Sequence, residues 1–201
     1  MCNNQTQLIC VTGADGSGKS TLIEKLTHQF PNAIECNIWA AFSDPNIHLF
    51  TSKQDIDDYL CALTPNSRAL FLAHAICFSI EKAKQTQAKY ILINAYFYKY
   101  FSSELCLGAD EKLITNLISF FPKVDKTIFL KLSPEKVVLR KINYSRYECG
   151  CQQATQAEFI TFQNCCAPIL EKFIQPHWLS LNAEENPDVL CEKAKEFILQ
   201  K

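Results

Sequence analysis

Long apolar runs and blocks of positive charge are both missing from this sequence. The longest apolar-rich stretch, residues 69–80, contains His74 and is too short to cross a bilayer. Lys and Arg never form a run of the length typical of nucleic-acid or membrane binding, and the net charge is −1. The first seven residues have neither the basic start nor the apolar run of a secretory signal. We therefore expect a cytoplasmic protein that binds neither nucleic acid nor a membrane.

Cysteine is abundant, but its pattern does not indicate a disulfide framework. There are eleven cysteines, an odd number that cannot pair completely, and thiols are kept reduced in the cytoplasm. We expect most of them to be small buried hydrophobic residues. A zinc site is the alternative for Cys149, Cys151, Cys165 and Cys166, although their spacing differs from that of zinc fingers.

Glycine is scarce, and its distribution is informative. Only five glycines are present, and three of them fall within one segment of eight residues, Gly13-Ala14-Asp15-Gly16-Ser17-Gly18-Lys19-Ser20. This segment matches the phosphate-binding pattern G-x-x-x-x-G-K-[ST]. The apolar residues 8–12 before it predict a buried strand, and the apolar residues of 22–30 after it recur at helical spacing. A strand, a loop and a helix in this order are the context that the motif requires.

The residue types of this loop suit a bound polyphosphate. Glycines let successive backbone N–H groups point at phosphate oxygens, and the helix directs its positive N-terminus at the same anion. Lys19 is expected to contact the β- and γ-phosphates of ATP, and Ser20 to offer its hydroxyl to Mg²⁺. The ATP-binding residues expected in the loop are Gly13, Asp15, Gly16, Ser17, Gly18, Lys19, Ser20 and Thr21. A glycine-rich turn that binds nothing is the alternative.

The rest of the chain alternates between strand and helix patterns. Strands are predicted at residues 8–12, 33–39, 90–93, 126–132 and 177–181, and a loop at residues 44–51. Helices are predicted at residues 22–30, 67–87, 110–121 and 134–144, and two more begin at the capping residues Thr155 and Asn186. Residues 1–201 are thus expected to form one α/β domain with a P-loop NTPase fold, a five-stranded parallel sheet flanked by helices on both faces. The polar residues 144–153 are expected to move as a lid.

The loop and three later segments resemble the thymidylate kinases, a family of P-loop nucleoside monophosphate kinases. Residues 12–21 resemble that family's E-G-x-[DE]-G-x-G-K-[ST]-T, and residues 68–75 resemble its helix motif L-L-x-F-A-A-D-R. Residues 91–96 occupy the place of the strand-end motif V-I-C-D-R-Y, and residues 139–148 resemble the arginine-bearing lid. The family is dimeric, so the resemblance implies a homodimer, for which the apolar helix at residues 67–87 is a candidate interface.

The resemblance also implies an acceptor site for a nucleotide. It places Asp15 against the acceptor nucleotide and Phe71 on the acceptor base, with Asn94 and Tyr96 at the end of the third strand. From the residues alone, Asp15 is equally well explained as a cap of the turn, and Phe71 as a core residue.

A second implication concerns the transferred phosphoryl group. Because Gly16 follows the loop's acidic residue, the resemblance implies that a lid arginine neutralises this group, and Arg146 is the candidate alongside Lys19. Arg140 is expected nearer the adenine and the phosphates of ATP. A solvated arginine on a helix is the alternative for each.

The resemblance breaks at the arginines that hold the acceptor's 5′-phosphate in the thymidylate kinases. The R-E-P motif is replaced by Trp39-Ala40-Ala41-Phe42, the helix arginine by Ala75, and the D-R pair by Asn94-Ala95. A dianionic phosphate would lose its bidentate partners, and the site would lose a carboxylate that helps to position Mg²⁺ or the acceptor. Lys99, on the loop after the third strand, and Arg68 are the candidate substitute cations.

Three functions follow from these observations. The first is a kinase that transfers the γ-phosphoryl group of Mg-ATP to dTMP or a related nucleotide. The second is a nucleoside kinase, in which Asp15 or Glu104 would have to replace the carboxylate base that Asn94 cannot supply. The third is a nucleotide-binding protein with lost or altered kinase activity.

Overall fold

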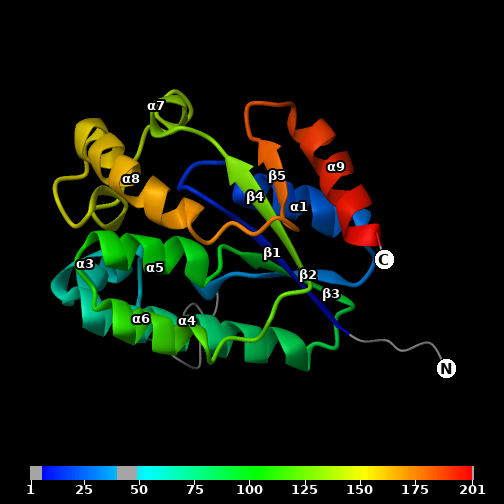
Figure 1. Cartoon of the computed structure of the whole chain (residues 1–201), viewed down its shortest axis with the longest axis horizontal. Helices are drawn as coiled ribbons and strands as arrows, with labels where there is room; N and C mark the ends of the chain where they lie inside the picture. Colours follow the sequence, from blue (N-terminus) through cyan, green and yellow to red (C-terminus); the bar gives the residue numbers. More distant parts are fainter. Residues whose placement is uncertain (1–5, 40–48, 201) are drawn as a thin grey trace.

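A parallel β-sheet forms the centre of the molecule. The computed structural model describes residues 6–39 and 49–200. Five strands pair in the order β2, β3, β1, β4, β5, and each pairing is parallel (Figure 1). Their bounds are β1 Gln7–Gly13, β2 Ala33–Cys36, β3 Tyr90–Asn94, β4 Lys126–Lys131 and β5 Leu179–Asn182. The predicted five-stranded parallel sheet is confirmed.

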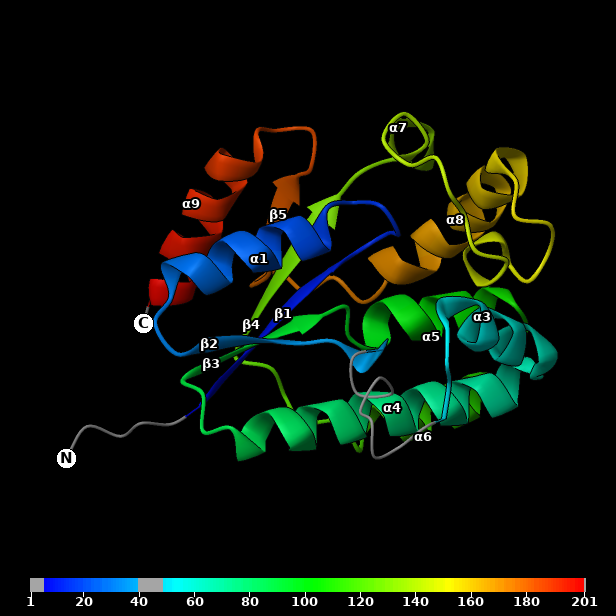
Figure 2. The ribbon, with the colours of Figure 1, turned by 180° about the vertical axis from the view of Figure 1, so that it is seen from behind.

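Helices cover both faces of this sheet (Figure 2). Successive residues of a strand point to opposite faces, so Ile9 and Val11 of β1 join one apolar layer, and Leu8 and Cys10 join the other. The first layer contains α1 (Lys19–Gln29) and α9 (Pro187–Leu199). The second contains α4 (Pro65–Gln85), α5 (Phe97–Cys106) and α6 (Glu111–Ile118).

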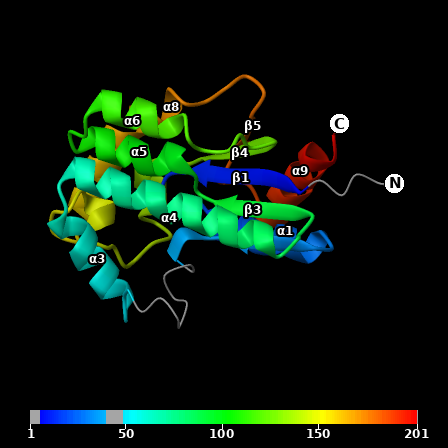
Figure 3. The same cartoon turned by 90° about the horizontal axis from the view of Figure 1, so that it is seen from below.

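Three further elements gather beyond the carboxyl ends of the strands, where the glycine-containing loop between β1 and α1 also lies. They are α3 (Lys53–Ala62), α8 (Gln156–Glu171) and the 3₁₀ helix η1 (Tyr147–Cys149), and they lie at the end of the sheet toward which β1 points (Figure 3). Ligands of open α/β sheets bind at this edge. The fold therefore places the loop and the predicted lid at one end of the molecule.

Several predicted helix starts are confirmed by their caps. The side chain of Thr155 accepts a hydrogen bond from Glu158 N at the start of α8, and Asn186 accepts one from Asp188 N at the start of α9. Asp110 caps α6 in the same way. Each side chain satisfies a backbone N–H that has no partner within its helix.

Other element boundaries differ from the prediction. The helix predicted at residues 67–87 begins earlier, with Thr64 as the N-cap of α4, because Pro65 takes the first helical position, where proline needs no hydrogen bond. Helix α7 (Pro134–Val137) ends well before residue 144. The residues that would continue it include Leu139, which is 84% exposed, and so no packing surface supports a longer helix there.

Two helices were not indicated by the sequence pattern. Helix α3 is largely polar, so no apolar pattern marks it in the sequence. The loop predicted at residues 44–51 precedes it, and residues 44–48 of that loop lie outside the described ranges. Helix α5 was expected to be a loop. In the structure α5 is buried between α4 and α8, and its polar residues are buried as well, namely Lys99, Ser102, Ser103 and Glu104.

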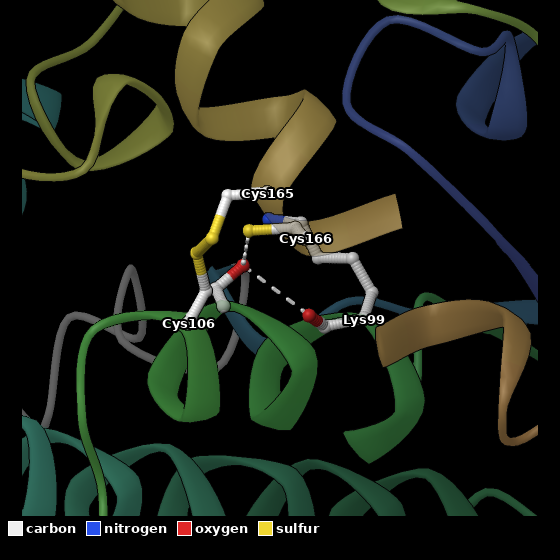
Figure 4. The surroundings of a disulfide bond; sticks show 5 residues. Lys99, Cys106, Cys165 and Cys166 are labelled. Atoms are coloured by element: carbon white, nitrogen blue, oxygen red, sulfur yellow. Dashed lines mark hydrogen bonds between the residues drawn. A yellow bond between two sulfur atoms is a disulfide. The ribbon is translucent and has the colours of Figure 1, made fainter. Parts of the chain in front are cut away.

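A disulfide joins Cys106 of α5 to Cys165 of α8 (Figure 4). This differs from the expectation of fully reduced thiols, because packing of α5 on α8 brings together two cysteines that lie 59 positions apart. Next to it, Cys166 Sγ lies 3.9 Å from Ser103 Oγ, and this hydroxyl donates to the carbonyl oxygen of Lys99 at 3.3 Å. The bond and these contacts fasten the two helices together.

Reduction of this disulfide is expected to lower the free energy of unfolding by about 2–4 kcal/mol, because the unfolded chain regains the entropy of an open loop. Urea unfolding with and without a thiol reductant measures the effect. Cys106→Ser should show the same loss and no further response to the reductant. Equal stability of the oxidised and reduced protein would contradict this prediction.

Candidate functional site

The loop between β1 and α1 has the backbone of an anion site. Gly13 has a φ of 145°, and a methyl group on it would lie 2.5 Å from the carbonyl oxygen of Leu130 on β4. Gly18, with a φ of 95°, caps α1 without any side-chain hydrogen bond. The first N–H groups of α1 consequently face the cleft without a capping side chain and are available to an anion.

Lys19 folds back over this loop. Its Nζ donates to the carbonyl oxygens of Gly13 at 3.1 Å and Ala14 at 2.7 Å, and the side chain is buried. Burial lowers the pKa of the Lys19 ammonium to about 8, and Asp15 only partly offsets this. A phosphate near Nζ would favour the charged form and reverse the shift.

Nucleotide binding at pH 8 is therefore expected to take up about half a proton at Lys19. Below pH 7 the ammonium is already charged, so the uptake should disappear. Calorimetric titration in buffers of different ionisation enthalpy counts the protons, with Lys19→Arg as the control because its guanidinium is charged at both pH values. We expect wild type to take up more protons than Lys19→Arg at pH 8 but not at pH 6.5. If the two proteins differ in proton uptake by the same amount at both pH values, the prediction is wrong.

Ser20, the residue expected to bind Mg²⁺, contacts the end of β3. Asn94 Nδ2 donates to Ser20 Oγ at 3.0 Å and to Glu35 Oε1, on β2, at 2.8 Å. The motif and the resemblance assign no role to Glu35. Parallel pairing of β2 with β3 brings these side chains together, and a carboxylate on a strand pattern gives no signal of this contact.

A cleft of about 440 Å³ opens in front of the loop. Of the residues predicted to bind nucleotide, those that line it are Asp15, Gly16, Gly18, Lys19, Ser20, Thr21, Asn94 and Arg140. Other residues that line it were not singled out as site residues, among them Lys141, Glu148 and Tyr100. The adjacent basic pair at positions 140 and 141 was a signal that could have identified Lys141.

The base of the cleft contains an ion pair between Asp15 and Lys99. Lys99 lies on α5, not on a loop, and its Nζ is 2.9 Å from Asp15 Oδ2 and 4.8 Å from the centre of the Tyr100 ring. Burial opposes both charges, but each partner stabilises the other. The pKa of Asp15 is thus held below its usual value, and that of Lys99 is raised.

On the opposite side, Arg140 and Lys141 lie over the loop. Arg140 Nη1 donates to the carbonyl oxygen of Ala183 at 2.9 Å, and Lys141 Nζ pairs with Glu148 Oε1 at 3.0 Å. Both cations line the cleft. The four cations that line the cleft, at positions 19, 99, 140 and 141, outnumber its two carboxylates, Asp15 and Glu148, and this excess of positive charge suits a polyphosphate.

Arg146 does not line this cleft. Its Nη1 lies 3.7 Å from Asp58 Oδ1 on α3, and its side chain is 47% exposed. The backbone N–H groups of Arg146 and Tyr147 both donate to the carboxylate of Asp57. Residues 144–153 are thus fastened to α3 in this structure, with the arginine directed away from Lys19.

The other predicted acceptor residues are also separated from the cleft lining. Phe71 is half-buried and packs edge-on against Tyr59 of α3, with ring centres 5.2 Å apart. Tyr96 is 1% exposed, and its hydroxyl donates to the carbonyl oxygen of Pro122. Gly13 and Ser17 belong to the loop but are not among the residues that line the cleft. Ala40–Phe42 of the proposed R-E-P replacement lie outside the described residues.

Arg68, suggested as a substitute cation, and Glu104, suggested as a substitute base, are paired with each other. Arg68 and Glu104 are buried and form an ion pair, with Arg68 Nε donating to both carboxylate oxygens at 2.9 and 2.8 Å. Tyr147 also donates to Glu104, at 2.9 Å. Glu104 is therefore not a free base, and Arg68 is not a cation available to a phosphate.

The four cysteines considered for zinc, which all lie in the described ranges, do not group as metal ligands. Within residues 6–39 and 49–200, no three His, Cys, Asp or Glu side chains come together as metal ligands, and Cys165 is already bonded to Cys106. None of the helices in these ranges has the length and hydropathy needed to cross a bilayer.

Three similar proteins of known sequence or structure are thymidylate kinases by name. No family model matches the sequence. The chain is 29% identical over 144 residues to a probable thymidylate kinase 1 of Saccharolobus solfataricus, which covers 70% of this chain and 72% of the relative. It is 26% identical over 153 residues to a probable thymidylate kinase of Pyrococcus horikoshii, with 67% and 68% covered.

A solved structure shows the same fold. Thymidylate kinase from Candida albicans superposes with a TM-score of 0.72 at 19% identity, covering 96% of this chain and 91% of that chain. The agreement over nearly the whole chain includes the sheet and the helices on both of its faces.

Proposed function

We propose that this chain, a divergent member of the thymidylate kinase family of phosphotransferases, transfers the γ-phosphoryl group of Mg-ATP to dTMP or a related nucleoside monophosphate. The observation that supports the proposal best is the cleft in which the loop's Lys19 and Ser20 face the Asp15–Lys99 pair. The loop would hold the donor, and the ion pair would lie where an acceptor must approach.

The residues present fit a Mg-nucleotide. Ser20 offers a hydroxyl oxygen, and Mg²⁺ in such sites takes one or two protein oxygens together with phosphate oxygens and water. When bound, the ion neutralises charge on the phosphates. Lys19 would contact the β- and γ-phosphates, and the open N–H groups of α1 would bind the same anion. Arg140 and Lys141 would cover it from the other side.

Transfer needs an in-line approach of the acceptor. An acceptor phosphate oxygen attacks the γ-phosphorus as the bond to the β–γ bridging oxygen breaks, which yields ADP and a nucleoside diphosphate. Lys99 is the cation that we propose for the acceptor's phosphate, in place of the arginines absent at Ala75 and Ala95. Ala95 has a φ of 56°, a conformation rare outside glycine, and lines the cleft.

Arg146 requires a movement to take part. We propose that residues 144–153 act as a lid and that its release from Asp57 would bring this arginine toward the phosphates. Until then, Lys141 is the lid-side cation nearest the loop, since it packs beside Gly16. A homodimer and a cytoplasmic location stay predictions.

A phosphotransfer screen with Mg-ATP tests the proposal. The acceptors are the nucleoside monophosphates and the nucleosides, and the products are separated by anion-exchange chromatography. Formation of dTDP or another nucleoside diphosphate supports it. Phosphorylation of nucleosides alone would favour a nucleoside kinase, and tight ATP binding without any product would favour a binding protein.

A further inference from the structure

Hydrogen bonds connect the carboxylate of Glu35, through Asn94, to Ser20, the residue proposed to hold the metal. Asn94 Nδ2 donates one hydrogen bond to Glu35 Oε1 at 2.8 Å and another to Ser20 Oγ at 3.0 Å. Asn37 Nδ2 also lies 3.4 Å from the same carboxylate oxygen. Glu35 is thus held from two sides, and one amide group links it to the serine of the loop.

The carboxylate decides how this amide is oriented. The Asn94 nitrogen has two N–H groups, and both are used, one for Glu35 and one for Ser20. If the amide were flipped, its oxygen would face a carboxylate that can only accept. Glu35 therefore keeps the N–H edge toward Ser20 Oγ, where the serine oxygen accepts a hydrogen bond and retains a lone pair for a cation.

The charge of the site follows the same pattern. The strand end of β3 carries an uncharged Asn94, and the adjacent strand β2 carries one carboxylate in contact with it. A divalent cation bound to Ser20 would have Glu35 as a nearby negative side chain, separated from Ser20 by Asn94. Together, Glu35 and Asn94 carry one negative charge, the same charge as one aspartate beside a neutral residue.

We infer that Glu35 is the acidic positioning residue of the Mg-nucleotide site, acting through Asn94 on Ser20. This inference rests on the proposed function, because it requires a metal bound with nucleotide phosphates. Glu35 supplies charge from β2 that β3 lacks and fixes the orientation of the serine hydroxyl. A role limited to joining β2 to β3 would affect stability but not the metal.

Asn94→Leu removes the amide that links Glu35 to Ser20 Oγ and adds no charge to the site. It should therefore weaken metal binding about as much as Glu35→Gln does. Because Glu35 acts through Asn94, the double variant Glu35→Gln/Asn94→Leu should lose no more than either single variant.

Binding of Mn²⁺ to the ADP-loaded protein, followed by electron paramagnetic resonance, tests this. Glu35→Gln and Asn94→Leu should each weaken Mn²⁺ binding by about tenfold, a typical effect of losing a partner of a metal ligand. The double variant should also bind about tenfold more weakly than wild type, not about a hundredfold as two independent effects would give. Glu24→Gln, with the same change of charge on the exposed side of α1, is the control and should bind as wild type does.

ADP binding measured with a chelator present, and therefore without metal, distinguishes failure of the Glu35 inference from failure of the proposed function. If wild type binds ADP but Glu35→Gln holds Mn²⁺ as tightly as wild type, the inference fails and the proposed function stands. An additive loss of about a hundredfold in the double variant would also overturn the inference. If wild type binds no nucleotide, the proposed function fails and the inference fails with it.

Discussion

Lys19→Ala is expected to lower the rate of phosphoryl transfer by about 100-fold or more, the usual cost of losing one preorganised group that stabilises the transition state. The ammonium sits within the loop, 3.1 Å from the carbonyl oxygen of Gly13 and 2.7 Å from that of Ala14, so it is placed before any ligand arrives. No other lysine on α1 can replace it, because Lys25 is paired with Asp188. Steady-state kinetics at saturating acceptor measures the loss.

The same variant should not be less stable than wild type. In the folded protein the pKa of Lys19 is lowered to about 8, so the unfolded chain binds this proton more tightly. The buried charge therefore destabilises the fold below pH 8, and the penalty disappears as pH rises toward the ordinary lysine pKa. Thermal unfolding at pH 7 checks this. Lys25→Ala is the control for activity, and a Lys19→Ala enzyme within tenfold of wild type would contradict the assignment.

Arg68→Ala is expected to destabilise the protein by about 3–5 kcal/mol, because it leaves a buried carboxylate without its partner. Glu104 is fully buried, and both of its oxygens accept from Arg68 Nε. Burial opposes the charge of Arg68, but Glu104 raises the pKa of the guanidinium above its usual value. Arg68 Nη1 also donates to the carbonyl oxygen of Leu60 at the end of α3. The pair thus joins α3, α4 and α5.

Urea unfolding of wild type and four variants measures how much the ion pair itself contributes to stability. Arg68→Ala and Glu104→Ala should each cost several kcal/mol, whereas Arg68→Met/Glu104→Leu, which removes both charges and keeps volume, should cost less than either. Lys193→Ala, which removes an exposed pair with Glu185, is the control and should change stability by about 1 kcal/mol or less. A loss below about 1 kcal/mol for Arg68→Ala would contradict this prediction.

Local sequence determined the elements of the fold and the donor side of the site. The motif at residues 13–20 is contiguous, and its strand, loop and helix follow from side chains that are neighbours in the chain. Burial on both faces made the strands apolar, and capping residues such as Thr155 marked helix starts. Helix α5 was not predicted, and its polar side chains Lys99 and Glu104 are buried against partners on other elements and do not form a solvent-exposed face.

The tertiary structure decided which charges meet. Lys99 reaches Asp15 from a different helix, Glu35 reaches Ser20 through Asn94 across two strands, and Glu104 is taken up by Arg68. None of these partners is near the other in the sequence, and the energy of each contact depends on burial that only the packed fold creates. The sequence by itself therefore determined the G-x-x-x-x-G-K-[ST] loop and the resemblance to a family, while packing decided which side chains face the proposed acceptor and metal sites.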